Sequence, residues 1–508
     1  MSGWGYINGF GQNGYDAAKS DRRYGGQPNA DVDINDIYAH DGYILGARGA
    51  HLLRNNAITV ALINGFQEGI NGAEGLKFKS QYSFTDNDED NRKYQDDIES
   101  CIKRGCADTR LDAAGLLTKQ DIENQWITDE ATYGESIWVR VHAPTRPGAC
   151  HEHAWRGINP LRISNPNYKP NDAKHFNGIH MGPHGPLGIW IASRHPNKIG
   201  NDGESLKWNY APLFDKNGER QVIWKAWRTG PEQIRGTGWL APVMGLIIHL
   251  GKVVEAHVIA KRLQACLGMV IETPDPVAAA RADRNGTVFT ENTKIEPGRT
   301  YYIKTGSRVT PFDFKYDGKD FEDFTSSLLQ LISAGTGTGI PWQYAFRQLT
   351  KSNMASARAA LMQAWRSFRR HQIKHEYHLR TIYRALLAED IARGRLVLPS
   401  GDDLDAAIAG YFVPPQRLVT DEHREMQAAE KKHQVLGVSK TTLSREAGYD
   451  QDAEREQRKA DQSADDAAGL LPVPAAEEAP AIEHDEHDDP DDIEAEEEQL
   501  QRIEKEAA

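Results

Sequence analysis

The sequence predicts an α+β fold, and three observations lead to this prediction. Two long segments, 240–268 and 354–391, repeat apolar residues with the helical period of 3.6. Strand-like runs of β-branched and aromatic residues gather between 135 and 224, and a second group lies between 287 and 304. At 508 residues, the chain has room for about three domain-sized units with a sizeable core.

The N-terminal half is expected to begin with an irregular arm, because residues 1–45 are rich in Gly, Asn, Asp and Tyr. Residues 46–80 and 85–125 are expected to be mostly helical. The segment 135–141 alternates in residue type and predicts a strand. Residues 144–220 hold many Gly, Pro, Asn and His, which favours short strands and long loops.

The C-terminal half is dominated by helical patterns. The first long helix has Pro242 in its first turn, where the missing N–H is harmless. An amphipathic segment over 321–334 ends in a glycine cluster, and the second long helix begins near Met354. Short helices are expected over Thr420–Leu436 and Ser439–Ala447, with a glycine between them as a C-cap.

Charge is distributed unevenly along the chain. The formal net charge is −13, yet residues 461–508 alone contain 18 acidic residues against Arg502 and Lys505. Residues 1–460 therefore carry a slight positive balance of +3. We expect the acidic tail to stay solvated through self-repulsion. Recruitment of a basic partner, or repulsion of DNA from a surface, is the functional alternative.

Cysteine content and hydropathy indicate the cellular compartment in which the protein is made. Four cysteines in so long a chain give no disulfide framework and fit a reducing environment. The first residues lack the positive and apolar regions of a signal peptide. The most apolar run, 239–260, contains His249, Lys252, Glu255 and His257, which argue against a membrane span. We therefore expect a soluble protein that is intracellular when made.

A glycine-rich loop is expected between the amphipathic segment and the second long helix, around Gly335, Gly337 and Gly339. It is not a Walker loop, because no Lys-Ser/Thr pair follows its last glycine and no strand precedes it. A dinucleotide-binding fingerprint also needs a preceding strand. Two interpretations stay open: a helix end with a flexible linker, or a mobile loop that grips a polyanion by shape and backbone. Its nearest cations are Arg347 and Lys351.

The helix after this loop is conspicuously basic, since it carries Arg366, Arg369, Arg370, His371, Lys374, His375, His378 and Arg380. If this helix faced a channel, it would contact phosphates in a salt-dependent manner. A solvated face, or pairing with acidic residues of a neighbouring subunit, is equally compatible. His371 and His375 are spaced to share a metal ion, but Gln372 replaces the glutamate that a zincin motif requires.

The best alternative metal cluster lies upstream and comprises Cys150, His151, Glu152, His153, His175, His180 and His184. Its spacing matches no standard zinc module, so no metal site is predicted. No G-x-S-x-G sequence and no fixed carboxylate pair indicates a nucleophile or an acid–base pair. We therefore predict no catalytic residue, no cofactor and no enzyme activity. A metal-dependent hydrolase built on Cys150–His184 is the alternative function.

Four ordered stretches carry a family resemblance. The longest contains Ser333-Ala334-Gly335, Gly339-Ile340-Pro341-Trp342, Leu349-Thr350, Ser356-Ala357-Arg358-Ala359-Ala360-Leu361 and Trp365-Arg366-Ser367-Phe368-Arg369-Arg370. The other three are Arg54-Asn55-Asn56, the run from Arg235 to Val243, and Glu296-Pro297-Gly298. In order and spelling they resemble the phage portal proteins of the lambda-like family. The resemblance covers residues 45–455. Two parts depart from the family pattern: residues 144–220 fit it poorly, and Lys351 to Ala355 stands where the family more commonly has an aromatic residue followed by two serines.

The resemblance implies a ring-forming subunit with long stem and channel helices, a mixed α/β wing, a small β-containing clip and a helical crown. The expected segments are an N-terminal arm (1–45), wing (46–239), first stem helix (240–268), clip (269–320), second stem helix (321–334), tunnel loop (335–354), channel helix (355–395), crown (396–455) and acidic tail (456–508).

The resemblance also implies a function: a dodecameric ring at one capsid vertex that conducts double-stranded DNA during packaging and ejection. Its partners would be terminase, the major capsid protein, scaffold and head–tail adaptor proteins, without a membrane. It would reside in the virion after assembly in the host cytoplasm. The tunnel loop would comprise Gly335, Thr336, Gly337, Thr338, Gly339, Ile340, Pro341 and Trp342. The candidate DNA contacts are Arg347, Lys351, Arg358, Arg366, Arg369 and Arg370. A head-completion or adaptor protein is a third alternative, although such proteins are generally much shorter.

Overall fold

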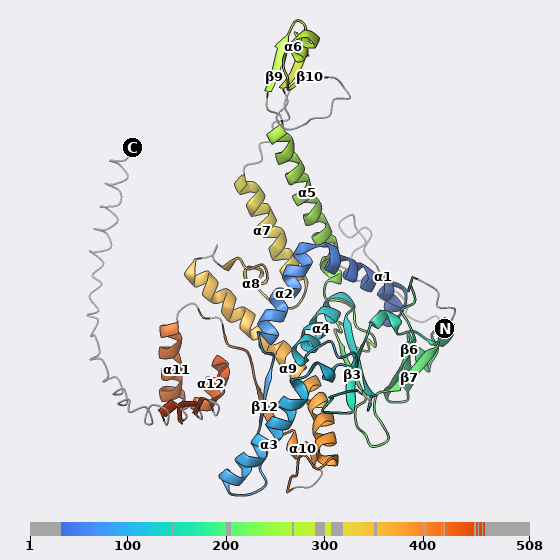
Figure 1. Cartoon of the computed structure of the whole chain (residues 1–508), viewed down its shortest axis with the longest axis vertical. Coiled ribbons are helices and arrows are strands. Elements are labelled where there is room, and N and C mark those ends of the chain that lie inside the picture. Colours follow the sequence, from blue (N-terminus) through green and yellow to red (C-terminus); the bar gives the residue numbers. More distant parts are fainter. Residues whose placement is uncertain are drawn as a thin grey trace, which may run out of the picture. The chain divides into compact units, whose positions relative to one another are not determined.

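The computed structural model describes residues 32–144, 146–199, 205–266, 269–289, 300–305, 318–349, 353–399, 403–417, 419, 422–451, 454–455, 457–459 and 461–462. Met1–Tyr449 group into one compact unit and Asp450–Ala508 into a second. The larger unit combines long helices with several small sheets (Figure 1). The predicted mixture of helix and sheet is therefore confirmed.

Two consecutive helices, α1 (Ile34–Asn55) and α2 (Ala57–Asn71), open the described chain. Asn56 separates them and caps both. Its N–H donates to the Leu52 carbonyl at the end of α1, and its side chain accepts from the N–H of Thr59 in α2. One residue thereby ends one helix and begins the next.

The irregular arm predicted over 1–45 is wrong from Ile34 onward, because α1 begins there; residues 1–31 lie outside the described residues. Glycines in α1 obscure its helical pattern, and they serve close packing. A Cβ at Gly49 would lie 2.5 Å from the carbonyl oxygen of Thr132, so only glycine lets the two backbones approach.

Two antiparallel sheets form the mixed region beside these helices. One has the order β3-β2-β8, built from β2 (Glu135–His142), β3 (His153–Ile158) and β8 (Val222–Ala226). The other has the order β4-β5-β6-β7, built from β4 (His175–Phe176), β5 (Ile179–Gly182), β6 (Gly185–Ala192) and β7 (Trp208–Pro212). They share a core that includes Ile137, Ile179, Ile189 and Val222. The short strands and long loops expected over 144–220 are confirmed.

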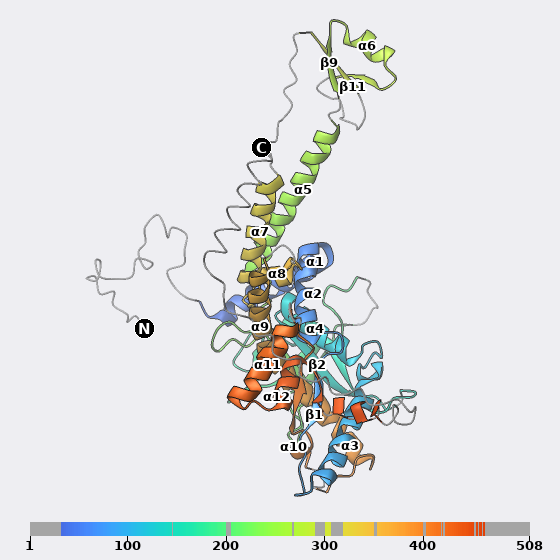
Figure 2. The same cartoon turned by 90° about the vertical axis from the view of Figure 1, so that its left-hand side faces the viewer.

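Two helices, α5 (Met244–Cys266) and α7 (Gly318–Gly335), run side by side in both Figure 1 and Figure 2. Between them in sequence lies a parallel sheet of order β10-β11-β9, built from β9 (Met269–Thr273), β10 (Gly286–Val288) and β11 (Thr300–Lys304). The short helix α6 (Pro276–Ala282) was not predicted. Asp275 caps it by accepting two backbone N–H groups.

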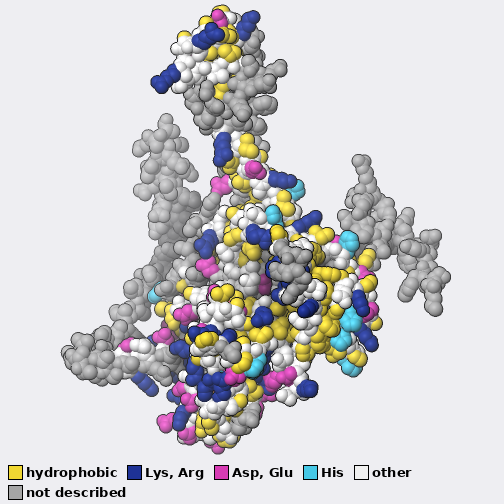
Figure 3. Space-filling model, turned by 45° about the vertical axis from the view of Figure 1, so that its right-hand side comes forward, with side chains coloured by type: hydrophobic (Ala, Val, Ile, Leu, Met, Phe, Trp, Pro, Cys, Tyr) yellow, Lys and Arg dark blue, Asp and Glu magenta, His cyan; other side chains and the backbone are white. Residues whose placement is uncertain are grey.

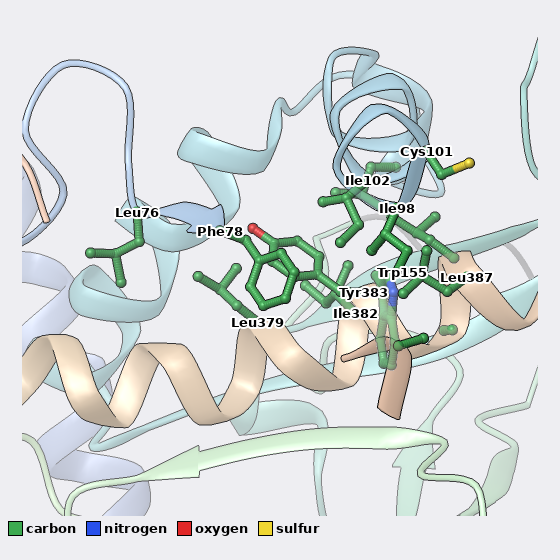
Figure 4. Close-up of a cluster of buried hydrophobic side chains, with 14 of the residues drawn as sticks. Leu76, Phe78, Ile98, Cys101, Ile102, Trp155, Leu379, Ile382, Tyr383 and Leu387 are labelled. Atoms are coloured by element: carbon green, nitrogen blue, oxygen red, sulfur yellow. The ribbon is translucent and has the colours of Figure 1, made fainter. Parts of the chain in front are cut away.

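The second long helix is α9 (Met354–Ala392), 39 residues that begin after the capping side chain of Asn353. α3 (Asp88–Cys106) packs across it, and α4 (Lys119–Thr132) and the antiparallel pair of β1 (Lys77–Ser80) and β12 (Gly410–Val413) contribute to the same core. Figure 4 shows Ile98 and Ile102 of α3 against Leu379, Ile382 and Tyr383 of α9. These contacts join elements that are almost 300 positions apart in the sequence.

The stretch 396–455, predicted as a helical crown, does not form one separate helical group. Leu396, Phe412 and the short helix α10 (Leu404–Ala407) pack into the core around α9, so this stretch is part of the main body. The helices expected afterwards are confirmed as α11 (Glu422–Leu436) and α12 (Lys440–Ala447).

Candidate functional site

The glycine-rich segment after α7 forms a compact turn whose glycines face outward. Gly335, Gly337 and Gly339 are exposed, whereas Thr336 and Thr338 between them are buried. Gly337 and Gly339 have φ values of 67° and 79°, in the left-handed region that favours glycine. The turn therefore presents bare backbone outside and keeps its side chains inside the subunit.

Hydroxyl groups close this turn from within. Thr336 Oγ1 donates to the Ser333 carbonyl at 2.7 Å and lies 2.8 Å from Thr338 Oγ1. Ser333 Oγ donates to the Ile340 carbonyl at 2.5 Å. These bonds supply partners to polar groups that burial has removed from water, which favours one conformation of the turn.

α9 holds the turn from the other side. Ser367 Oγ donates to the Gly339 carbonyl at 2.6 Å, and the Arg370 guanidinium donates to the Thr338 carbonyl at 3.0 Å. A Cβ at Gly339 would lie only 2.8 Å from Ser367 Oγ. The flexible linker that the glycines suggest is therefore replaced over Gly335–Ile340 by a turn tied to α9.

After this turn the chain forms the short helix α8 (Trp342–Ala345) and reaches the surface at Arg347. A Cβ at Gly65 of α2 would lie 2.9 Å from the Ala345 carbonyl, so α8 packs directly on α2. Arg347 has a φ of 55°, which is uncommon for a residue with a Cβ. Its guanidinium pairs with Glu68 at 2.9 Å.

Two further candidate DNA contacts also form ion pairs within the chain. Arg358 pairs with Glu425 at 3.3 Å, and Arg369 pairs with Glu376 at 2.5 Å. Because both arginine side chains are more than a third exposed, each pair contributes at most about 1 kcal/mol. Such pairs can be exchanged for another anion at little cost.

The remaining candidates differ from one another. Arg370 is committed to the turn carbonyl described above. Arg366 is exposed, and it has no ion pair within the part of the chain that the structure describes. Lys351 lies outside the described residues. Contact with DNA stays a prediction for all six.

The histidines of α9 do not add to its positive charge, contrary to the prediction of a basic run. His371, His375 and His378 are buried, on the side of the helix opposite its exposed arginines. Burial lowers the pKa of His371 and His378 to about 3 and also lowers the pKa of His375. All three are neutral at pH 7, because desolvation opposes the charged imidazolium.

The environment of His375 fixes its tautomer. Lys225 Nζ lies 3.0 Å from His375 Nε2, and Glu130 accepts from the same ammonium. Since an ammonium group only donates, Nε2 accepts and Nδ1 carries the proton. The sequence did not predict this buried network, whose members come from α4, β8 and α9.

A second buried ion pair, between Arg235 and Glu135, was also missed. The Arg235 guanidinium donates in addition to the carbonyls of Pro160 and Asn177, at 3.2 and 2.6 Å. It thus ties β2 to the segment after β3 and to the turn between β4 and β5. Arg235 stands in one of the family-like stretches, yet its carboxylate partner is 100 positions away, and no local pattern links the two.

The residues of the alternative metal cluster serve other contacts. His151 Nε2 lies 3.1 Å from Asp390 and His153 Nδ1 lies 2.9 Å from Glu389, at the end of α9. The downstream histidines belong to the β4–β6 region, where Figure 3 shows histidine side chains gathered on one side. Among the described residues, no three His, Cys, Asp or Glu side chains are arranged to hold a metal ion. The hydrolase alternative therefore has no support.

A sequence model of phage portal proteins, lambda family, matches residues 20–372. This match spans well over half of the chain and contains α5, α7, the glycine turn and the first half of α9. The chain belongs to the lambda family of phage portal proteins, as its motifs predicted.

Two solved structures are similar at low scores. The virion of a native gene transfer agent particle has a TM-score of 0.39 and 12% identity, covering 81% of this chain and 94% of that chain. The neck of the native particle, computed with C12 symmetry, has a TM-score of 0.36 and 11% identity with the same coverage. Likeness at this level carries no argument of its own. No curated protein matches the chain.

Proposed function

We propose that this chain is the subunit of a portal ring, a channel at one capsid vertex through which double-stranded DNA is packaged and ejected. A dodecameric ring, residence in the virion and docking of terminase, capsid, scaffold and head–tail proteins belong to the same proposal. The subunit acts by shape and position and carries no catalytic residue, so the energy for packaging comes from a separate motor.

The apolar surface of α5 is the observation that carries this proposal. Ile248, Val254, Val258 and Ile259 are between 40 and 49% exposed, although they are large aliphatic residues. Leu331 of the adjacent α7 is 57% exposed. Full burial of such a side chain contributes about 1.5–3 kcal/mol; these are already about half buried, so covering each contributes about 1 kcal/mol, and several together favour copies that cover one another's α5 over isolated subunits.

A ring of protein explains this surface better than a lipid bilayer does. By length and composition alone, Ala241–Arg262 is apolar enough to cross a membrane, and only 22% of its most apolar window is buried. Lys252 and Glu255 are exposed in the middle of the helix, however, and a bilayer would remove their charges from water. In an interface between helices of neighbouring subunits, Lys252 and Glu255 would remain at the solvent-accessible rim.

The family architecture then assigns roles to the other elements. α5 and α7 would be the stem helices, the β9–β11 sheet the clip, and Gly335–Trp342 the tunnel loop. The outward-facing glycines give this loop a surface without charge, which would let DNA slide past without strong attachment. Arg366 is the first candidate for a phosphate contact because it is exposed and has no ion pair among the described residues.

Electron microscopy of the purified full-length chain tests the proposal directly. We expect class averages of closed rings with a central hole and about twelvefold symmetry. Rings that also form with the acidic tail removed after residue 462 would show that the body alone carries the contacts. A chain that remains a monomer at its highest soluble concentration, with and without co-expressed scaffold, would contradict the proposal.

A further inference from the structure

The sheet of strands β4 to β7 has one face in the core and one face that carries a row of rings. Ile179, Ile189 and Ala211 point into the core. Because side chains alternate along a strand, Trp190 and Tyr210, which are paired across β6 and β7, point to the other side. We call this side the aromatic face. Its rings are those of His175, His180, Trp190, Trp208 and Tyr210, and of Tyr168, which packs on Trp208.

The rings of the aromatic face contact one another across the strands. Those of His175 and His180 are stacked, with their centres 5.4 Å apart. The centre of the Tyr210 ring lies 5.5 Å from that of His180 and 5.0 Å from that of Trp190. A Cβ at Gly188 would lie 2.5 Å from the Tyr210 ring, so this ring packs against the bare backbone of β6. The row is therefore ordered by its own contacts.

The aromatic face is open to solvent, and its strands carry no charge. Tyr210 is 40% exposed, and Tyr168, whose ring centre lies 5.3 Å from that of Trp208, is 55% exposed. No residue of β4, β5, β6 or β7 is Lys, Arg, Asp or Glu. Charged residues of both signs, such as Asp172 and Lys174, stand in the connections around the sheet. Exposed large rings with little charge between them are typical of the centre of an interaction surface.

A stretch of the same composition stands at the start of the sequence. Residues 1–15 contain no Lys, Arg, Asp or Glu, and a glycine adjoins each of their aromatic residues. The family model begins to match only at residue 20, and residues 144–220, which contain the strands of the aromatic face, fit the family pattern poorly. Two departures from the family thus share one composition, which is aromatic and uncharged. The aromatic residues of the first stretch are Trp4, Tyr6, Phe10 and Tyr15.

Helix α1, which follows this stretch, begins beside the sheet. Asn35 in its first turn accepts from the Ile234 N–H at 2.8 Å, and Ile234 packs against the core that the two sheets share. Farther along α1, the Tyr43 hydroxyl accepts from Asn197, in the connection between β6 and β7, at 2.6 Å. Residues 16–31 can span at most about 50 Å, which is about three times the length of a five-residue strand. Residues 1–15 can therefore reach the whole aromatic face.

We infer that residues 1–15 bind the aromatic face of their own subunit. Their aromatic side chains would pack edge-to-face on the exposed rings of Tyr168 and Tyr210, as the rings of the face already do with one another. Their glycines would let the backbone approach the sheet closely. The inference goes beyond the proposed function and is independent of it, because the contact forms within one subunit.

The composition of the face favours this segment over other occupants. Duplex DNA is held by cations at its phosphates, and the strands of the face provide none. A surface of another protein could cover the rings, but it would have to associate from solution. Residues 1–15 are joined to the chain that carries the face, at an effective concentration on the order of millimolar, so they occupy it first.

Photo-crosslinking in the full-length chain tests where the segment binds. Phe10→p-benzoylphenylalanine places a reactive group in the segment, and mass spectrometry of the digested protein identifies its partners. We expect most crosslinks to fall in residues 164–192 and 208–212. Mixing unlabelled and isotope-labelled chains before assembly shows whether each link lies within one chain. The same substitution at Val435, a 78% exposed residue of α11, is the control and should give no enrichment in these ranges.

A binding measurement tests the face itself. A fluorescent peptide with the sequence of residues 1–15 is titrated with full-length chain that carries Trp4→Ser and Phe10→Ser, so that its own segment no longer competes. We expect the peptide to bind, and to bind about tenfold more weakly when Tyr210→Ser is added, because the ring at the centre of the row is lost. Tyr377→Ser, at an exposed tyrosine of α9, should leave the affinity unchanged. Fluorescence anisotropy measures the affinities, and circular dichroism should show the same secondary structure in all variants.

The wild-type chain provides a further comparison. It should bind the peptide at least about tenfold more weakly than the Trp4→Ser, Phe10→Ser chain does, since its own segment occupies the face. Equal binding by these two chains, or equal binding with and without Tyr210→Ser, would overturn the inference. So would crosslinks from the Phe10 position that favour the aromatic face no more than those from Val435 do, or links that form only between chains. None of these results depends on ring formation, so the proposed function is judged separately by electron microscopy.

Discussion

The two long helices of this subunit reverse the usual relation between composition and burial. α5 is rich in Ile, Val and Leu, yet several of these side chains are exposed. α9 has many polar and charged residues, yet His371, Gln372, His375 and Asp390 are buried. The composition of a helix therefore does not determine whether it lies in the core or at the surface; the groups that surround it determine this.

Partners within the chain account for much of the polar side of α9, although Gln372 Oε1 and the Nδ1 atoms of His375 and His378 have no hydrogen-bond partner among the described residues. The Gln372 amide donates to the Ile70 carbonyl at 3.1 Å, and Asp390 accepts from Arg104 and pairs with His151. The first turns of α5 bury Met244, Ile247 and Leu250 in the core of the main body, but farther along the helix Val254, Val258 and Ile259 stay exposed beside α7. α9 is thus mostly covered by its own chain, whereas we propose that the exposed part of α5 is covered by other copies.

The largest decrease in the free energy of unfolding is expected from removing a buried charge that contacts α9. Lys225→Met removes the cation that Glu130 and His375 share, and leaves a buried carboxylate without a counter-charge. We expect the free energy of unfolding to fall by about 3–5 kcal/mol, as measured by urea titration. Adding Glu130→Leu should recover most of this loss, because no unpaired charge then remains. A loss below about 1 kcal/mol for Lys225→Met would mean that water reaches this pair.

A matched pair of glycines gives the next largest effect. A Cβ at Gly69 of α2 would lie 2.1 Å from the buried Phe368 ring of α9, whereas a Cβ at Gly251 of α5 meets nothing closer than 3.5 Å. Gly69→Ala should destabilise by about 1–3 kcal/mol through overpacking. Gly251→Ala should stabilise by about 0.5–1 kcal/mol through helix propensity. Denaturant midpoints that shift in the same direction would refute the contrast between a packed and an open helix.

The contrast between α5 and α9 also shows which features of the fold could be predicted from the sequence. Both long helices follow from apolar periodicity, and α11 and α12 follow from their caps and the glycine between them. α1 was missed before residue 46, since its glycines serve contacts with elements that are distant in the sequence. The sites of Lys225 and Arg235 could not be predicted, because their partners lie 95 and 100 positions away.

The candidate site was predicted in part. The position of the glycine turn and its lack of charged residues follow from the motif, but the outward placement of its glycines was not predicted. Its attachment to Ser367 and Arg370 could not be foreseen, because nothing local in the sequence says which side of α9 faces back toward the turn. The histidines of α9 were misread for the same reason: residue type gives the titratable group, but burial sets its pKa.

The buried histidines predict a pH dependence that α9 confers on the body. The folded-state pKa of His378 is about 3, against an ordinary value of 6.5, so the unfolded chain binds a proton that the folded chain does not. Its contribution to stability is complete above pH 6.5 and is lost as the pH falls below that value. Asp129 acts in the opposite direction, since burial raises its pKa to about 7.

A variant isolates the histidine contribution from that of Asp129. Between about pH 7.5 and pH 5.5, we expect His378→Gln to lose about 1.4 kcal/mol less unfolding free energy than the wild type loses. Urea titrations at both pH values measure the difference. Asp129→Asn should shift the pH profile the other way, and equal profiles for all three proteins would show that His378 is hydrated.

Substitutions on the exposed side of α5 should have the smallest effect on folding, and they test the comparison of α5 with α9 most directly. Val258→Asn with Ile259→Asn should change the unfolding free energy by at most about 0.5 kcal/mol, because both side chains are already exposed. Ile247→Asn, a buried position on the same helix, should destabilise strongly. Both are measured below the concentration at which rings form, so that assembly does not add to stability. The exposed pair should nevertheless abolish ring assembly, because in the proposed ring other copies cover its exposed side. If it destabilises the monomer as much as Ile247→Asn does, then the apolar side of α5 is covered by its own chain, and α5 and α9 follow the same rule.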